Sequence, residues 1–217
     1  MLEITLLGYM RVKMGGEPLN GLTRGKRAAL LAYLAVEHDQ DHSRETLASL
    51  LWPEADPHTA RGNLRQQLFH LRKGLGEYGE LIHAGRQYVR LHLDPERVWV
   101  DLHRLQDTAP RCGPEPRWEE CQDCLGGLTS RVALYQGPLL EELALETDND
   151  AFHDWLQSHR EAARRQTLTL LERLSHCHQA LGSPAQALAT VQGYLTSEPL
   201  DEAGHRLAMR LLAADGH

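Results

Sequence analysis

The residues best suited to bind an anionic partner lie between positions 57 and 76, where the chain reads PHTARGNLRQQLFHLRKGLG. This run holds four arginine or lysine side chains and no acid, although the whole chain of 217 residues has a formal net charge of −7. Guanidinium, ammonium and amide groups are the donors that contact phosphates and base edges. The local reversal of charge therefore favours a nucleic acid as partner.

The apolar residues of the same run predict one amphipathic helix. Leu64, Leu68, Leu71 and Leu75 recur at steps of four, three and four, which places them in a single stripe that must face a core. The opposite face then presents mainly polar groups. A solvated amphipathic helix without any partner is the alternative interpretation of this segment.

The elements around this helix predict how it is positioned. Alternating apolar residues from Leu2 to Leu6 indicate short strands, and an amphipathic helix follows from Gly25 to about Glu37. Ser43 can N-cap a short second helix, and Asp56 followed by Pro57 is typical of a helix start. After the basic helix, residues 81–83 and 88–91 flank a turn and predict a hairpin. This order of elements is that of a winged helix-turn-helix, whose third helix enters the major groove.

The residues of this region resemble a known family. The segments LEITLLGYMRV, RAALLAYLA and SRETLASLLWPEADPHTARGNLRQQLFHLRKGLG are similar to the winged-helix domain of SARP-type bacterial transcriptional activators, which is related to that of OmpR-type response regulators. The resemblance covers nearly all of residues 1–100. It implies a small N-terminal sheet, a positioning helix at about 43–52, a recognition helix at about 57–75 and a wing at about 79–92. It also implies binding to direct repeats in promoters and recruitment of RNA polymerase.

The resemblance and the helical register together give a set of expected DNA contacts. Phe69 departs from the family pattern, because a small polar residue is more usual there; it would either meet a thymine methyl group or serve a protein contact. The expected DNA-binding residues are Thr59, Arg61, Arg65, Gln66, Phe69, His70, Arg72 and Lys73 on the helix, with Arg86 and Arg90 on the wing.

The second half of the chain also has helical patterns. They predict two helices between 125 and 143, separated at Gly137-Pro138, then one long helix or two from 148 to 181 ending at Gly182, and two further helices. Apolar and turn residues fit the tetratricopeptide unit at Leu174, Gly182, Ala187, Val191 and Pro199. The segments LYQGPLLEEL and FHDWLQSHRE resemble the bacterial transcriptional activator domain that follows the winged helix in this family. The repeat period leaves the last helix without a partner, so we expect a fragment of a longer regulator or a face buried against a second copy or another protein.

A cysteine cluster, RCGPEPRWEECQDCL, raises the question of a metal site. Cys112, Cys121 and Cys124 could hold one zinc ion with a fourth ligand such as His103. A loop disulfide, a redox sensor and thiols without a special role remain alternatives. Zinc is thus the only candidate cofactor.

Charge and composition restrict the class of protein further. Residues 1–100 have a net charge of +1 and the remainder −8, so the second part would be repelled by phosphate and suits protein contacts better. No apolar run is long enough to span a membrane and no signal peptide is recognisable, so we expect a cytoplasmic location. Phosphate-binding loops, nucleophile elbows, zinc-protease motifs and dinucleotide fingerprints are missing from the sequence, which argues against an enzyme.

The sequence therefore predicts a mainly α-helical protein with a small N-terminal β-sheet and a β-wing. Residues 1–100 are expected to be a winged helix-turn-helix DNA-binding domain, and residues 101–217 a tetratricopeptide-like transcriptional activator domain, incomplete at its C-terminus. The expected function is sequence-specific regulation of transcription, with promoter DNA, RNA polymerase and a second copy of the chain as partners. The alternative is a helical protein-interaction scaffold with weak or lost DNA binding.

Overall fold

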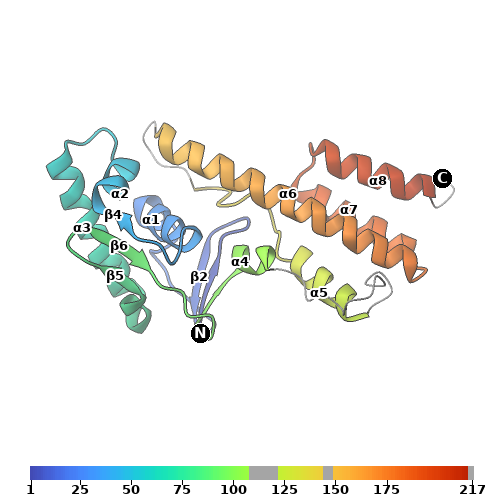
Figure 1. The fold of residues 1–217 in the computed structure, drawn as a ribbon, viewed down its shortest axis with the longest axis horizontal. Helices are drawn as coiled ribbons and strands as arrows, with labels where there is room; N and C mark the ends of the chain where they lie inside the picture. Colours follow the sequence, from blue (N-terminus) through green and yellow to red (C-terminus); the bar gives the residue numbers. More distant parts are fainter. Residues whose placement is uncertain (108–121, 144–148, 215–217) are drawn as a thin grey trace. The chain divides into compact units, whose positions relative to one another are not determined.

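The computed structural model describes residues 1–107, 122–143 and 149–214. They form two compact units. Unit 1 comprises Met1–Asp101 with Leu140–Ser158, and unit 2 comprises Leu102–Leu139 with His159–His217. Figure 1 shows the order of the elements along the chain. The fold is mainly helical with small sheets near the N-terminus, as the sequence predicts.

A four-stranded sheet begins unit 1. Its strands are β1 (Leu2–Thr5), β2 (Arg11–Met14), β3 (Glu17–Pro18) and β7 (Val98–Val100), in the order β3-β2-β1-β7. β1 pairs antiparallel with β2 and parallel with β7. The alternation predicted for the first strand is present, because Leu2 and Ile4 are buried while Glu3 and Thr5 are half-buried.

A buried carboxylate holds the end of the first strand. Asp101 begins α4 (Asp101–Gln106) and is 1% exposed. Its carboxylate accepts hydrogen bonds from the backbone N–H groups of Leu6, at 2.8 and 2.9 Å, and Leu7, at 2.9 Å. Hydrogen bonds to a charged acceptor offset the cost of burying the carboxylate.

Three helices form the core of unit 1: α1 (Gly25–Val36), α2 (Arg44–Leu51) and α3 (Pro57–Gly74). Both predicted N-caps are present. The Ser43 hydroxyl accepts from the Thr46 N–H at 2.9 Å, and the Asp56 carboxylate accepts from the N–H groups of His58 and Thr59 at 3.0 and 3.1 Å. The caps satisfy amide donors that have no partner within the helix.

The predicted hairpin is present and belongs to a three-stranded sheet. A 3-10 helix, η1 (Gly76–Leu81), connects α3 to β5 (Ile82–Ala84), which pairs with β6 (Tyr88–Leu91). The short strand β4 (His42–Ser43) pairs with the other side of β6, so the order is β4-β6-β5. β4 and β7 were not predictable from the sequence pattern, because each is only two or three residues long.

The prediction of a second helix between residues 125 and 143 is wrong. The segment after α5 (Gln122–Val132) forms turns and an isolated bridge at 133–143 rather than a second helix. Leu140 has a φ of +53°, which a helical residue does not adopt. Its N–H donates to the carbonyl oxygen of Leu6 at 2.8 Å, and the Glu141 N–H donates to that of Gly8 at 3.0 Å. Pairing with the N-terminal segment thus replaces helical hydrogen bonds.

The long pattern in the second half forms one helix, α6 (Asp150–Ala180), whose first turns belong to unit 1. Asn149 caps it by accepting from the Phe152 N–H at 3.1 Å, and its own side-chain amide donates to the Leu50 carbonyl oxygen at 2.5 Å. The Trp155 indole donates to the Glu37 carboxylate at 2.9 Å. These contacts attach residues 149–155 to α1 and α2.

The remaining helices of unit 2 are α7 (Pro184–Ser197) and α8 (Glu202–Ala214). Gly182 ends the preceding helical segment with a φ of +69°, as expected for a C-terminal glycine. α7 and α8 pack closely at Gly204, where an added Cβ would lie 2.9 Å from Leu195 and 3.0 Å from Tyr194. Leu207 and Leu211 bury the inner face of α8 within the chain, so the expectation that the last helix lacks a partner is wrong.

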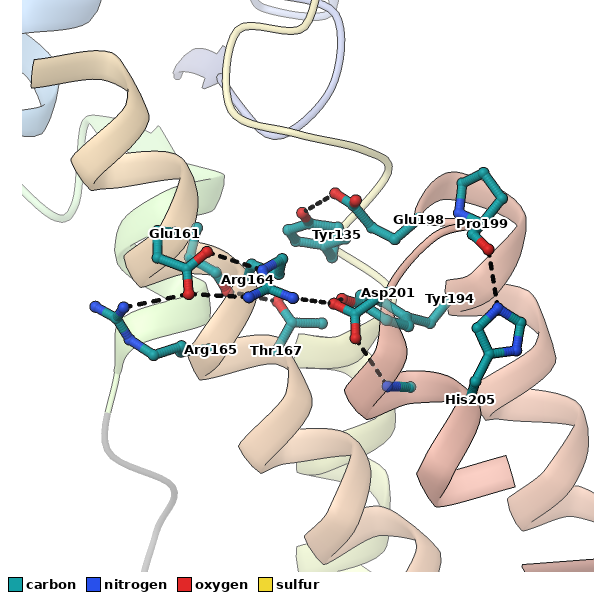
Figure 2. A network of polar contacts seen from close by, with 12 residues as sticks. Tyr135, Glu161, Arg164, Arg165, Thr167, Tyr194, Glu198, Pro199, Asp201 and His205 are labelled. Carbon is teal, nitrogen blue, oxygen red and sulfur yellow. Dashed lines mark hydrogen bonds and ion pairs between the residues drawn. The ribbon is translucent and has the colours of Figure 1, made fainter. Parts of the chain in front are cut away.

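A polar network organises the turn between α7 and α8 (Figure 2). Asp201 is 5% exposed and accepts from the Gly204 N–H at 2.8 Å, from the Tyr194 hydroxyl at 2.7 Å and from the Arg164 guanidinium. Arg164 also donates to Glu161 at 2.9 Å. Burial raises the pKa of Asp201, but these hydrogen bonds outweigh burial and hold the pKa below its usual value.

Candidate nucleic-acid interface

The basic helix predicted from the sequence is α3, and its two faces differ as expected. Its inward stripe consists of buried Ala60, Leu64, Leu68 and Leu71. Hydrogen bonds from the side chain and backbone of Thr59 hold the pKa of the capping Asp56 below its usual value. At the other end, Arg72 and Lys73 occupy the last turn, where cations interact favourably with the helix dipole. The helix is therefore anchored by leucines and presents its opposite face outward.

Most of the residues expected to contact DNA are accessible on this outer face. His70 is half-buried, and its ring packs edge-on to that of Phe69 with 5.5 Å between centroids. Phe69 itself is 63% exposed. The exposed members of the predicted set on α3 are Thr59, Arg61, Arg65, Gln66, Phe69, Arg72 and Lys73.

Arg61 already has intramolecular partners. Its Nε donates to the Pro57 carbonyl oxygen at 3.0 Å, and its guanidinium forms an ion pair with Glu45 at 3.2 Å. Both side chains of this pair are exposed, so the pair contributes little and another anion can compete for Arg61.

A groove lies between α3 and the hairpin, with a volume of about 620 Å³. Arg65, Phe69, Arg72 and Lys73 line one side of it, together with Arg44 from α2. Arg72 donates from Nε to the Gly79 carbonyl oxygen at 3.2 Å. Within the described residues, no carboxylate forms an ion pair with Arg65, Arg72 or Lys73. The groove thus concentrates positive charge that the protein itself leaves unneutralised.

Two acids, Glu77 and Glu80, also line the groove from η1. Glu80 is neutralised by Arg97, which lies 2.8 Å away and whose guanidinium stacks over the Tyr78 ring. The four cations of the groove still outnumber its acids. The site as a whole is therefore suited to a polyanion.

Arg44 is a residue that the sequence analysis missed. It is the first residue of α2, and its Nε donates to the Gly85 carbonyl oxygen at 2.8 Å while its own N–H donates to Gln87 at 2.9 Å. Burial lowers the pKa of its guanidinium, and the charge of Arg65 lowers it further. An indication was present in the sequence, because a cation in the first turn of a helix is unfavourable for the helix dipole.

The two arginines predicted on the wing differ in their surroundings. Arg86 lies exposed in the turn between β5 and β6. Arg90 is half-buried: it donates to the Asp39 carbonyl oxygen and lies 3.9 Å from the Asp41 carboxylate. It lines a second hollow beside β6, with Asp41, His83 and His92, rather than the groove at α3.

The predicted metal ligands are only partly described. Cys112 and Cys121 lie outside the described residues. Cys124 is buried in α5, and the described residues contain no group of three or more His, Cys, Asp or Glu side chains placed to hold a metal ion. Zinc binding stays a prediction. The described helices also include none that is long and apolar enough to cross a bilayer.

The fold and this surface define a class of protein, a winged helix followed by a helical domain. Residues 100–217 match the family model of the bacterial transcriptional activator domain, which is more than half of the chain. The chain therefore belongs to this family of transcription regulators, and its identification as a SARP-type bacterial transcriptional regulator is confirmed.

A solved structure shares the fold. It is that of Mycobacterium tuberculosis EmbR in complex with a low-affinity phosphopeptide, with a TM-score of 0.71 and 20% sequence identity. The similarity covers 97% of this chain and 54% of that chain, so this chain spans about half the length of EmbR. No curated protein matches this chain. The likeness to EmbR supports the fold, a winged helix with the helical activator domain.

Proposed function

We propose that this regulator binds promoter DNA in a sequence-specific manner through the groove at α3. The observation that carries the proposal is the set of four cations, Arg44, Arg65, Arg72 and Lys73, that share one groove between α3 and the hairpin. Three of them have no ion pair with a carboxylate in the described part of the chain. Such groups gain most from contact with phosphates, because binding releases the counterions of the DNA.

In this proposal α3 enters the major groove and the hairpin contacts the adjacent backbone. Arg65, Arg72 and Lys73 contact phosphates, and Arg86 in the exposed turn does so from the hairpin. Gln66 is exposed and His70 is half-buried, and in the proposal both side chains contact base edges. Thr59, Arg61 and Arg90 have a smaller part, because each is already engaged with neighbouring residues.

We propose residues 1–100 as the DNA-binding domain and residues 101–217 as the activator domain. The acidic charge of the second part, −8, favours contacts with proteins rather than with DNA. Its partners in the proposal are RNA polymerase and a second copy of the chain, which would place two winged helices on the direct repeats of a promoter.

A gel-shift assay across a range of salt concentrations tests the DNA binding. The wild-type chain should form a specific complex whose affinity falls steeply as the salt concentration rises. The double variant Arg65→Ala, Lys73→Ala should form little of this complex. Loss of two phosphate contacts should reduce the magnitude of the negative slope of log K against log salt by about 1.8. The matched control is Arg11→Ala, Lys13→Ala, which removes the same charge from exposed positions of β2.

The control variant should bind as the wild type does. Equal losses in both variants would show that only net charge matters and would contradict a site at α3. A wild-type chain without a specific complex would favour the alternative, a helical interaction scaffold that does not bind DNA tightly.

A further inference from the structure

The exposed ring of Phe69 has no evident role in the stability of unit 1. At 63% exposed, it is the most exposed large apolar side chain among the described residues of this unit. Its contact with another aromatic ring is the edge-on packing with His70, which is its neighbour in the chain. Most of the ring is therefore left in water when the protein is free, where apolar surface is unfavourable.

The position of Phe69 on α3 is central to the basic face. Arg65 lies one turn before it and Lys73 one turn after it, and residues four apart share one face of a helix. Both cations line the same groove as the ring. In the proposed complex the ring lies on the same face of α3 as these two cations, so it approaches the same stretch of DNA that they contact.

The major groove offers one methyl group among the four natural bases, the C5 methyl of thymine. Apart from C–H groups, the rest of each base edge consists of hydrogen-bond donors and acceptors. A phenyl ring has no donor or acceptor, so it would leave any other base edge partly unsatisfied.

We propose that Phe69 contacts the methyl group of a thymine and thereby specifies thymine at one position of the DNA sequence that this protein binds. The inference rests on the proposed DNA binding and adds a base preference to it. The ligand is duplex DNA with a thymine opposite the centre of α3.

The test removes only the methyl group. Binding sequences are first selected from a random duplex pool with the full chain, and each thymine of the preferred sequence is then replaced in turn by deoxyuridine, which keeps the hydrogen-bonding edge. At one position the replacement should weaken wild-type binding about fourfold, the effect of burying one methyl group.

The variant Phe69→Ala should bind the thymine and deoxyuridine duplexes equally at that position, and Phe69→Leu should keep part of the preference. Phe69 is exposed, so we expect both variants to fold. The control Tyr9→Ala removes another exposed aromatic ring of unit 1 outside the groove and should keep the full preference.

The outcomes separate this inference from the proposed function. If the wild-type chain selects no DNA sequence, both are overturned. If it selects a sequence but no thymine can be distinguished from deoxyuridine, or if Phe69→Ala keeps the wild-type sensitivity, the thymine contact is overturned while DNA binding stands.

Discussion

The guanidinium of Arg44 donates from Nε to the carbonyl oxygen of Gly85 at 2.8 Å, so the first residue of α2 holds the turn of the hairpin. The same side chain lines the groove at α3 and lies close enough to Arg65 for the two charges to interact. The side chain of Arg44 in α2 is therefore hydrogen-bonded to the hairpin and repelled by Arg65 of α3.

Replacement of Arg44 should weaken DNA binding while leaving the free energy of unfolding almost unchanged. In Arg44→Ala, we expect DNA affinity to fall about tenfold, since a groove cation and the hydrogen bond to the turn are both lost. The free energy of unfolding should change by less than about 1 kcal/mol, because relief of repulsion with Arg65 offsets the lost bond. Gel shifts and urea unfolding measure the two effects. Amide exchange near Gly85 that stays as slow as in the wild type would contradict the positioning role.

Gly79 is required where α3 meets the turn that leads to the wing. A Cβ built on it would lie 2.3 Å from the backbone carbonyl oxygen of Arg72, and backbone cannot move as a flexible side chain does. Gly79→Ala should therefore lower the free energy of unfolding by about 2 to 3 kcal/mol. The control is Gly126→Ala, where the added methyl group meets nothing within 4 Å. Urea unfolding of both variants measures the difference, and equal stabilities would show that the close approach is not retained in solution.

Replacement of Gly62 by alanine should stabilise the fold, whereas the same replacement at Gly79 should destabilise it. Gly62 lies on the exposed face of α3, and an added Cβ meets nothing within 4 Å. Gly62→Ala should raise the free energy of unfolding by about 0.5 to 1 kcal/mol, because alanine restricts the unfolded chain and favours a helix. DNA affinity should fall in the same variant, since a methyl group is added to the face proposed to approach the bases. An unchanged affinity would indicate that this part of α3 does not reach the DNA.

Acid should weaken unit 2 through Asp201. The pKa of this carboxyl is lower in the folded chain than in the unfolded chain, so its contribution to stability is complete above the unfolded pKa of about 3.9. That contribution is lost as the pH falls through the folded pKa. Asp201→Asn should lower the free energy of unfolding by about 2 kcal/mol at pH 7.

Chemical unfolding at pH 7 and near pH 2 measures this effect. The difference between wild type and Asp201→Asn should shrink at the lower pH, where the wild-type carboxyl is becoming protonated. A difference of the same size at both pH values would contradict a role for the charge. Glu202→Gln, an exposed acid next to it in the chain, is the control.

Local signals explain which parts of the fold the sequence could predict. The start of α3 was predictable because Asp56 and Pro57 act within one turn, and its buried stripe because Leu64, Leu68 and Leu71 follow the helical period. The turn at Leu140 was not, since its φ of +53° depends on pairing with Leu6 and Gly8, more than a hundred residues away.

In the candidate site, too, local sequence signals predict some features, whereas others depend on contacts between distant parts of the chain. Exposure of Arg65, Phe69 and Lys73 follows from their register opposite the leucines. The position of Arg44 beside Gly85 depends on how β4 brings the start of α2 against β6, and no local pattern contains that information. The partners of Arg90 on the loop after α1 are hidden from the sequence for the same reason.

The carboxylate of Asp101, which accepts from the N–H groups of Leu6 and Leu7, has a consequence for synthesis of the chain. β1 lies between β2 and β7, and β7 is made nearly a hundred residues later. During translation the first strand emerges from the ribosome long before its parallel neighbour and its carboxylate acceptor exist. The sheet can therefore be completed only after residue 101 has left the exit tunnel, whereas the helices α1, α2 and α3 can begin to form from local contacts before that.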